Sequence, residues 1–208
     1  MDKADILTEG TMTAAENQGP LSVYRLLPSM REFQLLHFDN SPVELMRWQL
    51  GGSVGEPPTD FNAEWGGEPR WPRSEFPNGD PCCPVVSGRI ADVLRDELAT
   101  AGRLVPVNID GSAGDEYRLH VVERVVDCFD EGRSSTPDQI GRIKTSVFRP
   151  EALPVELAAF RFPQFPTAVC WNGWMVERLG RLLGDQLESR LIWSEDPSLA
   201  PHPAPWGF

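Results

Sequence analysis

Two stretches of the chain decide its fold: Pro81–Leu98 reads PCCPVVSGRIADVLRDEL, and Pro166–Leu183 reads PTAVCWNGWMVERLGRLL. The second stretch lies 85 residues after the first, and the two align without a gap. In both, a short apolar run ends at a good helix-capping residue, Ser87 or Asn172, whose side-chain oxygen can accept from a free amide of the first turn. We interpret the pair as an internal repeat, and a chance similarity imposed by a shared strand-to-helix pattern is the alternative interpretation.

Within each stretch, apolar residues recur at every fourth position. That spacing places them on one side of a helix, so each helix has a single apolar stripe to bury. The runs at 104–109 and 190–193 follow as segments of strand length. Each unit is therefore predicted to be a strand, a helix and a second strand. The stripes consist of Ile90, Leu94 and Leu98 in the first unit and of Met175, Leu179 and Leu183 in the second.

The segment between the two units also has the pattern of strands. Residues 116–126 (EYRLHVVERVV) alternate apolar and charged side chains until the phase shifts at Val122, which predicts a strand with a bulge. Residues 140–148 (IGRIKTSVF) are predicted to be its antiparallel neighbour, joined through the DEGRSSTPD turn. We therefore expect an α+β fold with a mainly antiparallel sheet and two helices packed against it.

One domain is expected to account for most of the 208 residues. Residues 1–20 are polar and without periodicity, which predicts a flexible N-terminal arm. Residues 21–195 form the single α+β domain, and residues 196–208 (DPSLAPHPAPWGF) form a tail with too many prolines to join a sheet interior. The Gly- and Pro-rich loop at 51–84 contains several aromatic residues, so it either packs on the domain or binds a partner.

The composition excludes several classes of protein. Hydrophobic residues make up 40% of the chain and Trp contributes 7 residues, which is enough for a packed core. The formal net charge of −12 argues against nucleic acid as a partner, because phosphate contacts need clustered Lys and Arg. It favours a basic protein partner, or it only keeps the protein soluble. No apolar stretch has the length of a membrane span or a signal peptide, so we expect no membrane association and a cytoplasmic location.

Cysteine and histidine spacings predict no metal site. The four cysteines contain no CxxC pair, and no histidine lies at ligand spacing from another histidine or from a cysteine. We expect reduced thiols in the core and no cofactor. These residues are Cys82, Cys83, Cys128 and Cys170, and His37, His120 and His202.

One short motif is typical of hydrolases. Residues 51–55 (GGSVG) fit the G-x-S-x-G turn that exposes a nucleophilic serine, here Ser53, at the start of a helix. Pro57 and Pro58 follow within five residues and oppose a helix at that place. A flexible Gly-rich turn is the competing interpretation.

Acidic residues gather in two segments. One is the aromatic loop at 51–84, and the other runs from Asp110 to Glu131. A carboxylate pair can do acid and base chemistry, solvated surface charge is a second interpretation, and an acidic face that steers a basic partner, with aromatic anchors, is a third. The candidate residues are Phe61, Glu64, Trp65, Glu68 and Trp71 in the loop, and Asp127, Asp130 and Glu131 in the second segment.

Four stretches resemble a known family: PVVSGRIADVLRDEL, LVPVNI, YRLHVVERVVDCFDEGRS and FRFPQFPTAVCWNGWMVERL. Together they resemble the bacterial immunity domain of the Myxococcus type, formerly a domain of unknown function, which is assigned to polymorphic-toxin systems. The likeness covers residues 80–195, and its most specific part is 125–134 (VVDCFDEGRS), similar to the family's strand ending in V-D-x-x-D before a polar turn with Ser. The family's strand commonly ends in Asn where His120 or Val121 stands here, and the first 80 residues match no family pattern.

The resemblance implies a cytoplasmic immunity protein without catalytic residues. Such a protein binds a cognate toxin domain, here expected to be basic, and neutralises it through an acidic, aromatic-containing surface. The eight candidate residues above are then contacts with the toxin. Two alternatives stay open: a hydrolase that uses Ser53 or a carboxylate pair from Asp127, Asp130 and Glu131, and an adaptor or chaperone for a secreted effector.

Overall fold

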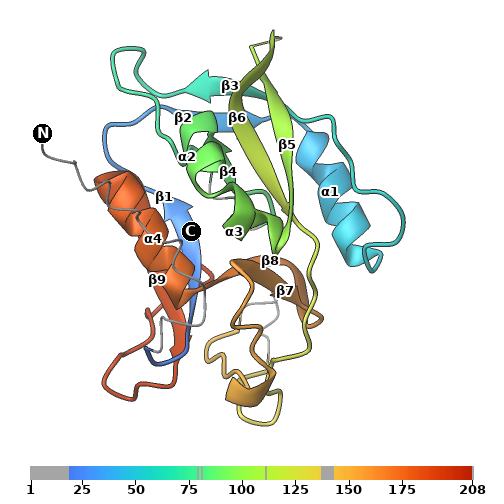
Figure 1. The fold of residues 1–208 in the computed structure, drawn as a ribbon, viewed down its shortest axis with the longest axis vertical. Coiled ribbons are helices and arrows are strands. Elements are labelled where there is room, and N and C mark those ends of the chain that lie inside the picture. The colour runs from blue at the N-terminus through green and yellow to red at the C-terminus, as the bar shows by residue number, and fades with distance from the viewer. Residues whose placement is uncertain (1–18, 79, 81, 111, 137–142, 208) are drawn as a thin grey trace, which may run out of the picture.

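The chain folds into two β-sheets with helices between and beside them (Figure 1). The computed structural model describes residues 19–78, 80, 82–110, 112–136 and 143–207, and for residues 112, 113 and 115 it describes the backbone alone. The predicted N-terminal arm therefore lies outside the described residues, apart from Gly19 and Pro20.

The first sheet has four strands, and all its pairs are antiparallel. A helix, α4 (Gly173–Leu183), and a short 3-10 turn, η3 (Gly184–Gln186), connect its last two strands along the chain. In spatial order the strands are β7 (Ala159–Phe162), β8 (Phe165–Asn172), β1 (Ser22–Pro28) and β9 (Leu187–Ser194).

The second sheet has five strands, in the order β2 (Leu35–Phe38), β3 (Asn62–Gly66), β5 (Gly102–Ile109), β6 (Ser112–Val122) and β4 (Val85–Ser87). Its pairs are antiparallel except that β3 runs parallel to β5. Helix α1 (Ser41–Leu50) links β2 to β3, whereas α2 (Gly88–Val93) and α3 (Arg95–Ala99) link β4 to β5. A 3-10 turn, η2 (Pro150–Ala152), precedes β7. The predicted α+β class with mainly antiparallel pairing is confirmed, with two sheets in place of one.

The two predicted repeat units have the same topology. In each, the strand before the helix and the strand after it are parallel and do not pair, because an antiparallel strand lies between them. That central strand is β6 in the unit β4-α2-α3-β5 and β1 in the unit β8-α4-β9. The units differ in chain order, since β6 follows its unit whereas β1 comes at the start of the chain.

The two predicted helix caps have different outcomes. Ser87 accepts a hydrogen bond from the Ile90 amide at 3.3 Å, as predicted. Asn172 makes no such bond. Its Nδ2 instead donates to the carbonyl oxygens of Pro154 and Leu157, at 2.8 and 2.7 Å, because the loop before β7 lies against it. Asn172 therefore fastens a loop to the start of α4, and the predicted cap is wrong there.

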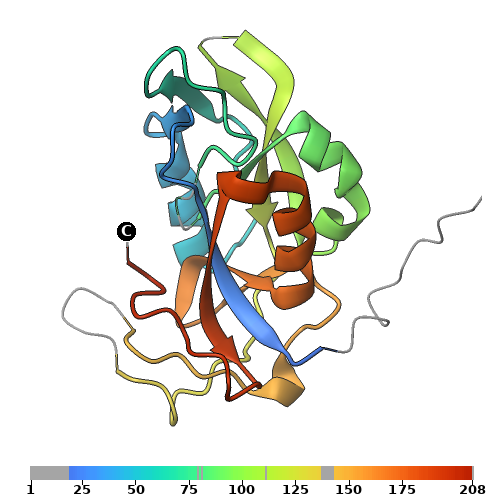
Figure 2. The same ribbon diagram turned by 90° about the vertical axis from the view of Figure 1, so that its left-hand side faces the viewer.

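Both apolar stripes enter one core. The helices of the two units lie side by side in Figures 1 and 2, and the core that they share also takes Leu26 from β1, Val122 from β6 and Trp171 from β8. All six stripe residues belong to it: Ile90, Leu94, Leu98, Met175, Leu179 and Leu183. The helices of the two units therefore share one core, and the two units depend on each other for burial.

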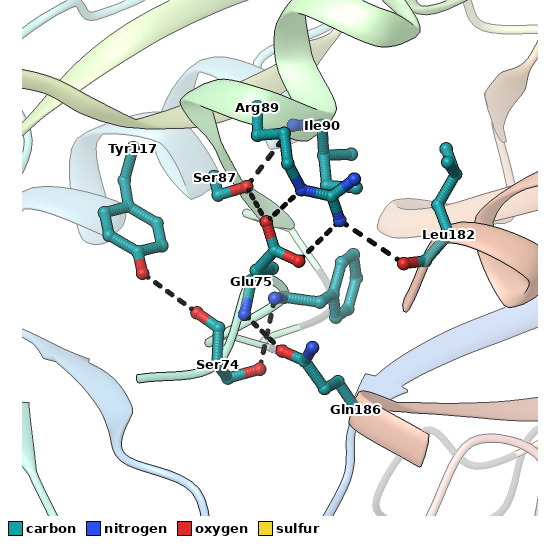
Figure 3. Close-up of polar contacts among 9 residues, drawn as sticks. Ser74, Glu75, Ser87, Arg89, Ile90, Tyr117, Leu182 and Gln186 are labelled. Carbon is teal, nitrogen blue, oxygen red and sulfur yellow. Dashed lines mark hydrogen bonds and ion pairs between the residues drawn. The ribbon is translucent and has the colours of Figure 1, made fainter. Parts of the chain in front are cut away.

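Glu75 connects the loop before β4 to both units (Figure 3). Its Oε1 accepts from Ser87 Oγ at 2.9 Å and from Arg89 Nε at 2.7 Å, while Arg89 Nη2 lies 2.5 Å from Oε2. Arg89 Nη2 also donates to the carbonyl of Leu182 near the end of α4, and the Glu75 amide donates to Gln186 Oε1 at 2.7 Å. The hydrogen bonds from Arg89 are the main reason that the pKa of Glu75 lies below its usual 4.5.

Replacing this carboxylate should weaken the junction between the units. Glu75→Gln keeps the shape but loses the charge-assisted bonds to Arg89, so we expect the free energy of unfolding in urea to fall by about 1–3 kcal/mol at pH 7. Because the pKa is lowered in the folded state, this difference should shrink as the pH falls below 4.5. The control is Glu68→Gln, whose exposed pairing with Arg70 at 3.6 Å should matter little. Equal stabilities of the two variants would contradict a clamp at Glu75.

His120 lies completely buried on β6. Its Nε2 is 3.0 Å from the carbonyl oxygen of Leu98, its ring centroid is 5.7 Å from that of Trp171, and its Nδ1 has no hydrogen-bond partner among the described residues. Burial lowers the pKa of His120 from 6.5 to about 4, since the charged ring has no water around it. The residue is neutral in the core at pH 7.

We predict that His120 makes the fold acid-sensitive. Between pH 6.5 and about 4 the unfolded chain binds a proton at this residue that the folded chain does not. The free energy of unfolding is therefore highest above pH 6.5 and falls toward pH 4, by on the order of 3 kcal/mol in all. His120→Gln keeps a donor for Leu98 without this titration. Urea unfolding at steps from pH 7.5 to 4 should show that the free energy of unfolding changes less with pH for the variant than for the wild type. Parallel profiles would contradict the assignment.

Two sequence predictions around this core are wrong. β6 ends at Val122, and the register shift lies between Pro106 and Asn108 on its partner β5. The predicted strand at 140–148 is absent from its described part, 143–148, which makes a single bridge from Phe148 to Phe129. Serine side chains take several of the amides that a ladder would use: Ser135 Oγ accepts from the amides of 144 and 145, and Ser134 Oγ accepts from that of 147.

The C-terminal tail is irregular, as its prolines predict, but it is packed down. Trp206 is 8% exposed in the core beside β7 and β8, and its Nε1 donates to Ser146 Oγ at 3.1 Å. The carbonyl of Gly207 accepts from Arg25 Nη1 at 3.0 Å and from Arg190 Nη1 at 2.7 Å. The tail therefore closes one side of the four-stranded sheet.

Candidate functional site

The aromatic candidates of the loop at 51–84 serve mainly to pack it. Phe61 is completely buried in the core of the five-stranded sheet, so it is not a surface contact, and that prediction is corrected. Trp65 lies partly buried on β3, with its ring centroid 5.2 Å from that of Tyr117 and the guanidinium of Arg73 4.8 Å above it. Trp71 is also partly buried and lies against Gly67. Both tryptophans present only part of their rings to a partner.

The acidic candidates of this loop have different surroundings. Glu68 pairs weakly with Arg70 at 3.6 Å, and its backbone carbonyl accepts from Gln34 Nε2. Glu64 lies exposed on β3, directly opposite His37 of β2. It makes no ion pair within the described part of the chain, so its charge is free to act on a partner.

Glu64 is one wall of an acidic hollow that the sequence alone does not reveal. The hollow has a volume of about 430 Å³ and lies where β2 ends, β3 begins and the β5–β6 hairpin turns. Two backbone bonds fix its shape: the Asp39 amide donates to the carbonyl of Asn62, and the Asp110 amide donates to that of Ala63. Its lining residues are His37, Phe38, Asp39, Asn62, Ala63, Glu64 and Asp110.

Three carboxylates of the hollow have no cation beside them. Asp39, Glu64 and Asp110 make no ion pair among the described residues. Asp39 is held by the Ser41 amide, which donates to Oδ1 at 2.7 Å, and its pKa is lowered chiefly by hydrogen bonds to Ser41. Asp110 has a left-handed backbone with φ 52°, a conformation that Asp tolerates better than most residues. The hollow therefore presents negative charge that no ion pair among the described residues neutralises.

The second acidic segment is tied to the protein instead. Asp127 pairs with Arg149 at 3.1 Å, Asp130 Oδ1 accepts from the amide of Arg133, and Glu131 Oε1 accepts from Gln164 Nε2 at 2.7 Å. The segment after β6 that carries these residues lies at the opposite end of the molecule from β3, as both ribbon views show (Figures 1 and 2). The carboxylates at 127–131 therefore do not form one surface with the acidic loop at 51–84.

Asp39 and Asp110 are the residues of the hollow that sequence reasoning misses. Asp110 belongs by sequence to the segment that ends at Glu131, and Asp39 stands alone after a short apolar run. Only the pairing of β3 with both β2 and β5 brings them to Glu64. A useful signal in the sequence is that Asp110 directly follows the predicted strand at 104–109 and that Asp39 directly follows an apolar run.

Ser53 of the G-x-S-x-G motif supports a buried arginine. Arg161 is 0% exposed, and its Nη2 donates to Ser53 Oγ at 2.7 Å. Its other donors reach the carbonyls of Val122 and Pro166, at 2.8 and 2.7 Å, and its guanidinium lies 5.4 Å from the ring centroid of Trp48. Burial lowers the pKa of Arg161 to about 10. Ser53 lies just after helix α1, and no helix begins directly after it. Among the described residues, no histidine is hydrogen bonded to Ser53.

Removing the hydroxyl should therefore affect stability. Ser53→Ala leaves a buried charged donor of Arg161 without its acceptor, and we expect it to lower the free energy of unfolding by about 1–3 kcal/mol. Thr59→Ala, at an exposed position of the same loop, is the matched control and should change it by less than about 0.5 kcal/mol. A hydrolytic activity in an esterase screen that Ser53→Ala abolishes without destabilising the protein would make Ser53 a nucleophile.

The four cysteines are free and buried. Burial raises the pKa of the Cys128 thiol to about 12 and also raises the pKa of the Cys170 thiol, which keeps both protonated. Cys82 and Cys83 lie with their sulfurs 3.6 Å apart, and the pKa of Cys83 is raised by its hydrogen bond with Cys82 and by burial. The prediction of reduced thiols in the core agrees with these positions.

The described residues contain no group of three or more His, Cys, Asp or Glu side chains that could hold a metal ion. None of the helices in that part of the chain combines the length and the apolar composition that crossing a bilayer requires. No protein-family model matches the chain, and no curated protein matches it either.

Proposed function

We propose that this chain is a cytoplasmic immunity protein that binds a basic toxin domain and neutralises it. The acidic hollow of Asp39, Glu64 and Asp110 carries the proposal, because three carboxylates that make no ion pair among the described residues favour a cationic ligand surface. The net charge of −12 would add long-range attraction for a basic partner. The resemblance of residues 80–195 to the Myxococcus-type immunity domain supports the same proposal.

The alternatives have less support. Ser53 as a hydrolase nucleophile lacks a hydrogen-bonded histidine and already binds Arg161. Asp127, Asp130 and Glu131 each bind a different neighbour, which does not favour a catalytic carboxylate pair. An adaptor or chaperone would use the same acidic surface, and it differs in its effect, since it would bind its client without abolishing the client's toxicity.

Co-expression with the toxin domain encoded by the neighbouring reading frame tests the proposal. We expect the chain to restore growth and to bind that domain with a Kd of about 1 nM or below. Because the attraction is between exposed charges, the association rate should fall at least about tenfold between 50 and 500 mM NaCl. Binding without rescue of growth would favour the adaptor, and an association rate that does not change with salt would contradict the electrostatic part.

Charge reversal in each acidic segment identifies the surface that is used. Glu64→Lys should slow association about tenfold, because it places a cation in the hollow beside Asp39 and Asp110. Glu131→Lys makes the same change of net charge at the other end of the molecule and is the matched control. Surface plasmon resonance at low salt measures both. If Glu131→Lys has the larger effect, the second acidic segment is the binding surface.

A further inference from the structure

One flank of helix α1 exposes apolar side chains in the described part of the chain. Pro42, Leu45 and Gln49 face the core, and Val43, Met46 and Leu50 on the adjacent flank are 38, 39 and 63% exposed. Positions 43, 46 and 50 lie on one helix face, since helical neighbours recur at three, four and seven residues. Val54 in the following turn is 81% exposed. We call these four side chains the α1 stripe.

The α1 stripe concentrates the exposed apolar residues of the chain. It holds four of the nine exposed large hydrophobic residues in the described part, and the other five, Met30, Val93, Val125, Val155 and Leu199, stand on separate segments. Single exposed apolar residues are normal on a protein surface, but several on one helix face mark an interaction site. α1 borders the five-stranded sheet, whose core Leu45 enters (Figure 1).

The first turn of α1 lies next to the acidic hollow. α1 begins at Ser41, whose amide donates to Asp39 Oδ1 at 2.7 Å, so the first turn of the helix borders the hollow. The stripe follows the helix from Val43 to Leu50, about 10 Å at 1.5 Å per residue. The charged residues of α1, Glu44 and Arg47, pair with each other at 2.5 Å and leave the helix neutral. An apolar strip with a charged end has the composition of a protein interface.

We infer that the α1 stripe is the apolar centre of the surface that binds the basic toxin domain, and that the acidic hollow is its charged rim. This inference rests on the proposed function. The charges decide between the two candidate occupants, because a second copy would bring another acidic hollow and another −12 against the first. A basic partner relieves that repulsion. It would place an apolar patch on α1 and Lys or Arg side chains at Asp39, Glu64 and Asp110.

The test uses the full-length protein and the toxin domain encoded by the neighbouring reading frame. Met46→Asp adds a charge that attracts a basic partner, so any loss of affinity must come from the apolar contact. We expect its Kd to rise at least tenfold, mainly through a faster dissociation rate. Val93→Asp, at a residue that is 50% exposed on α2, is the matched control and should stay within about twofold. Urea unfolding verifies the fold of each variant, and Met46→Ala with Leu50→Ala replaces Met46→Asp if that variant unfolds.

The outcomes separate this inference from the proposed function. If the wild type does not bind the toxin domain, the proposed function fails. If the wild type binds and Glu64→Lys slows association, but Met46→Asp and the alanine pair bind as tightly as the wild type, the α1 stripe is not part of the interface. Sedimentation equilibrium completes the test, because a wild-type dimer that Met46→Asp converts to monomer would make the stripe a contact between two copies and overturn the inference.

Discussion

The packing of two helical units into one core is the constraint on which the rest of the structure depends. α4 and the pair α2 and α3 bury their stripes against each other and against both sheets, so neither unit has an alternative place for its apolar residues. Glu75 adds a polar connection at the same junction, through Arg89 to the end of α4 and through its own amide to Gln186. Because the interior between the sheets is filled in this way, a binding surface has to lie on the outside of the molecule.

On the outside, strand pairing decides where the charge collects. β3 pairs with β2 on one side and with β5 on the other, and this arrangement brings Asp39 and Asp110 to Glu64 although they are far apart in the sequence. At residues 127–131 the carboxylates meet internal donors and fix the irregular chain after β6. Acidic residues of similar appearance in the sequence thus have two roles, one structural and one available for a partner.

The parts that depend on local pattern could be predicted from the sequence. Ile90 and Met175 begin stripes with clear helical spacing, and their alignment at an offset of 85 residues indicated two units that the structure shows to share a topology. The predictions that failed concern residues whose positions depend on contacts with residues far away in the sequence. Asn172 resembles a helix cap but binds the loop before β7. The segment at 143–148 is predicted to be a strand, but several of its amides bond to serine hydroxyls. Phe61 looks like a surface anchor but is buried. The hollow could not be predicted for the same reason.

Hydrogen exchange of the complex with the cognate toxin domain tests the central claim most directly, because it maps the bound surface without any substitution. The account predicts that binding slows amide exchange in residues 37–50, 62–66 and 109–112, which hold α1 and the walls of the hollow, and leaves residues 127–131 unchanged. Slower exchange confined to residues 127–131, with none in α1 or β3, would contradict it.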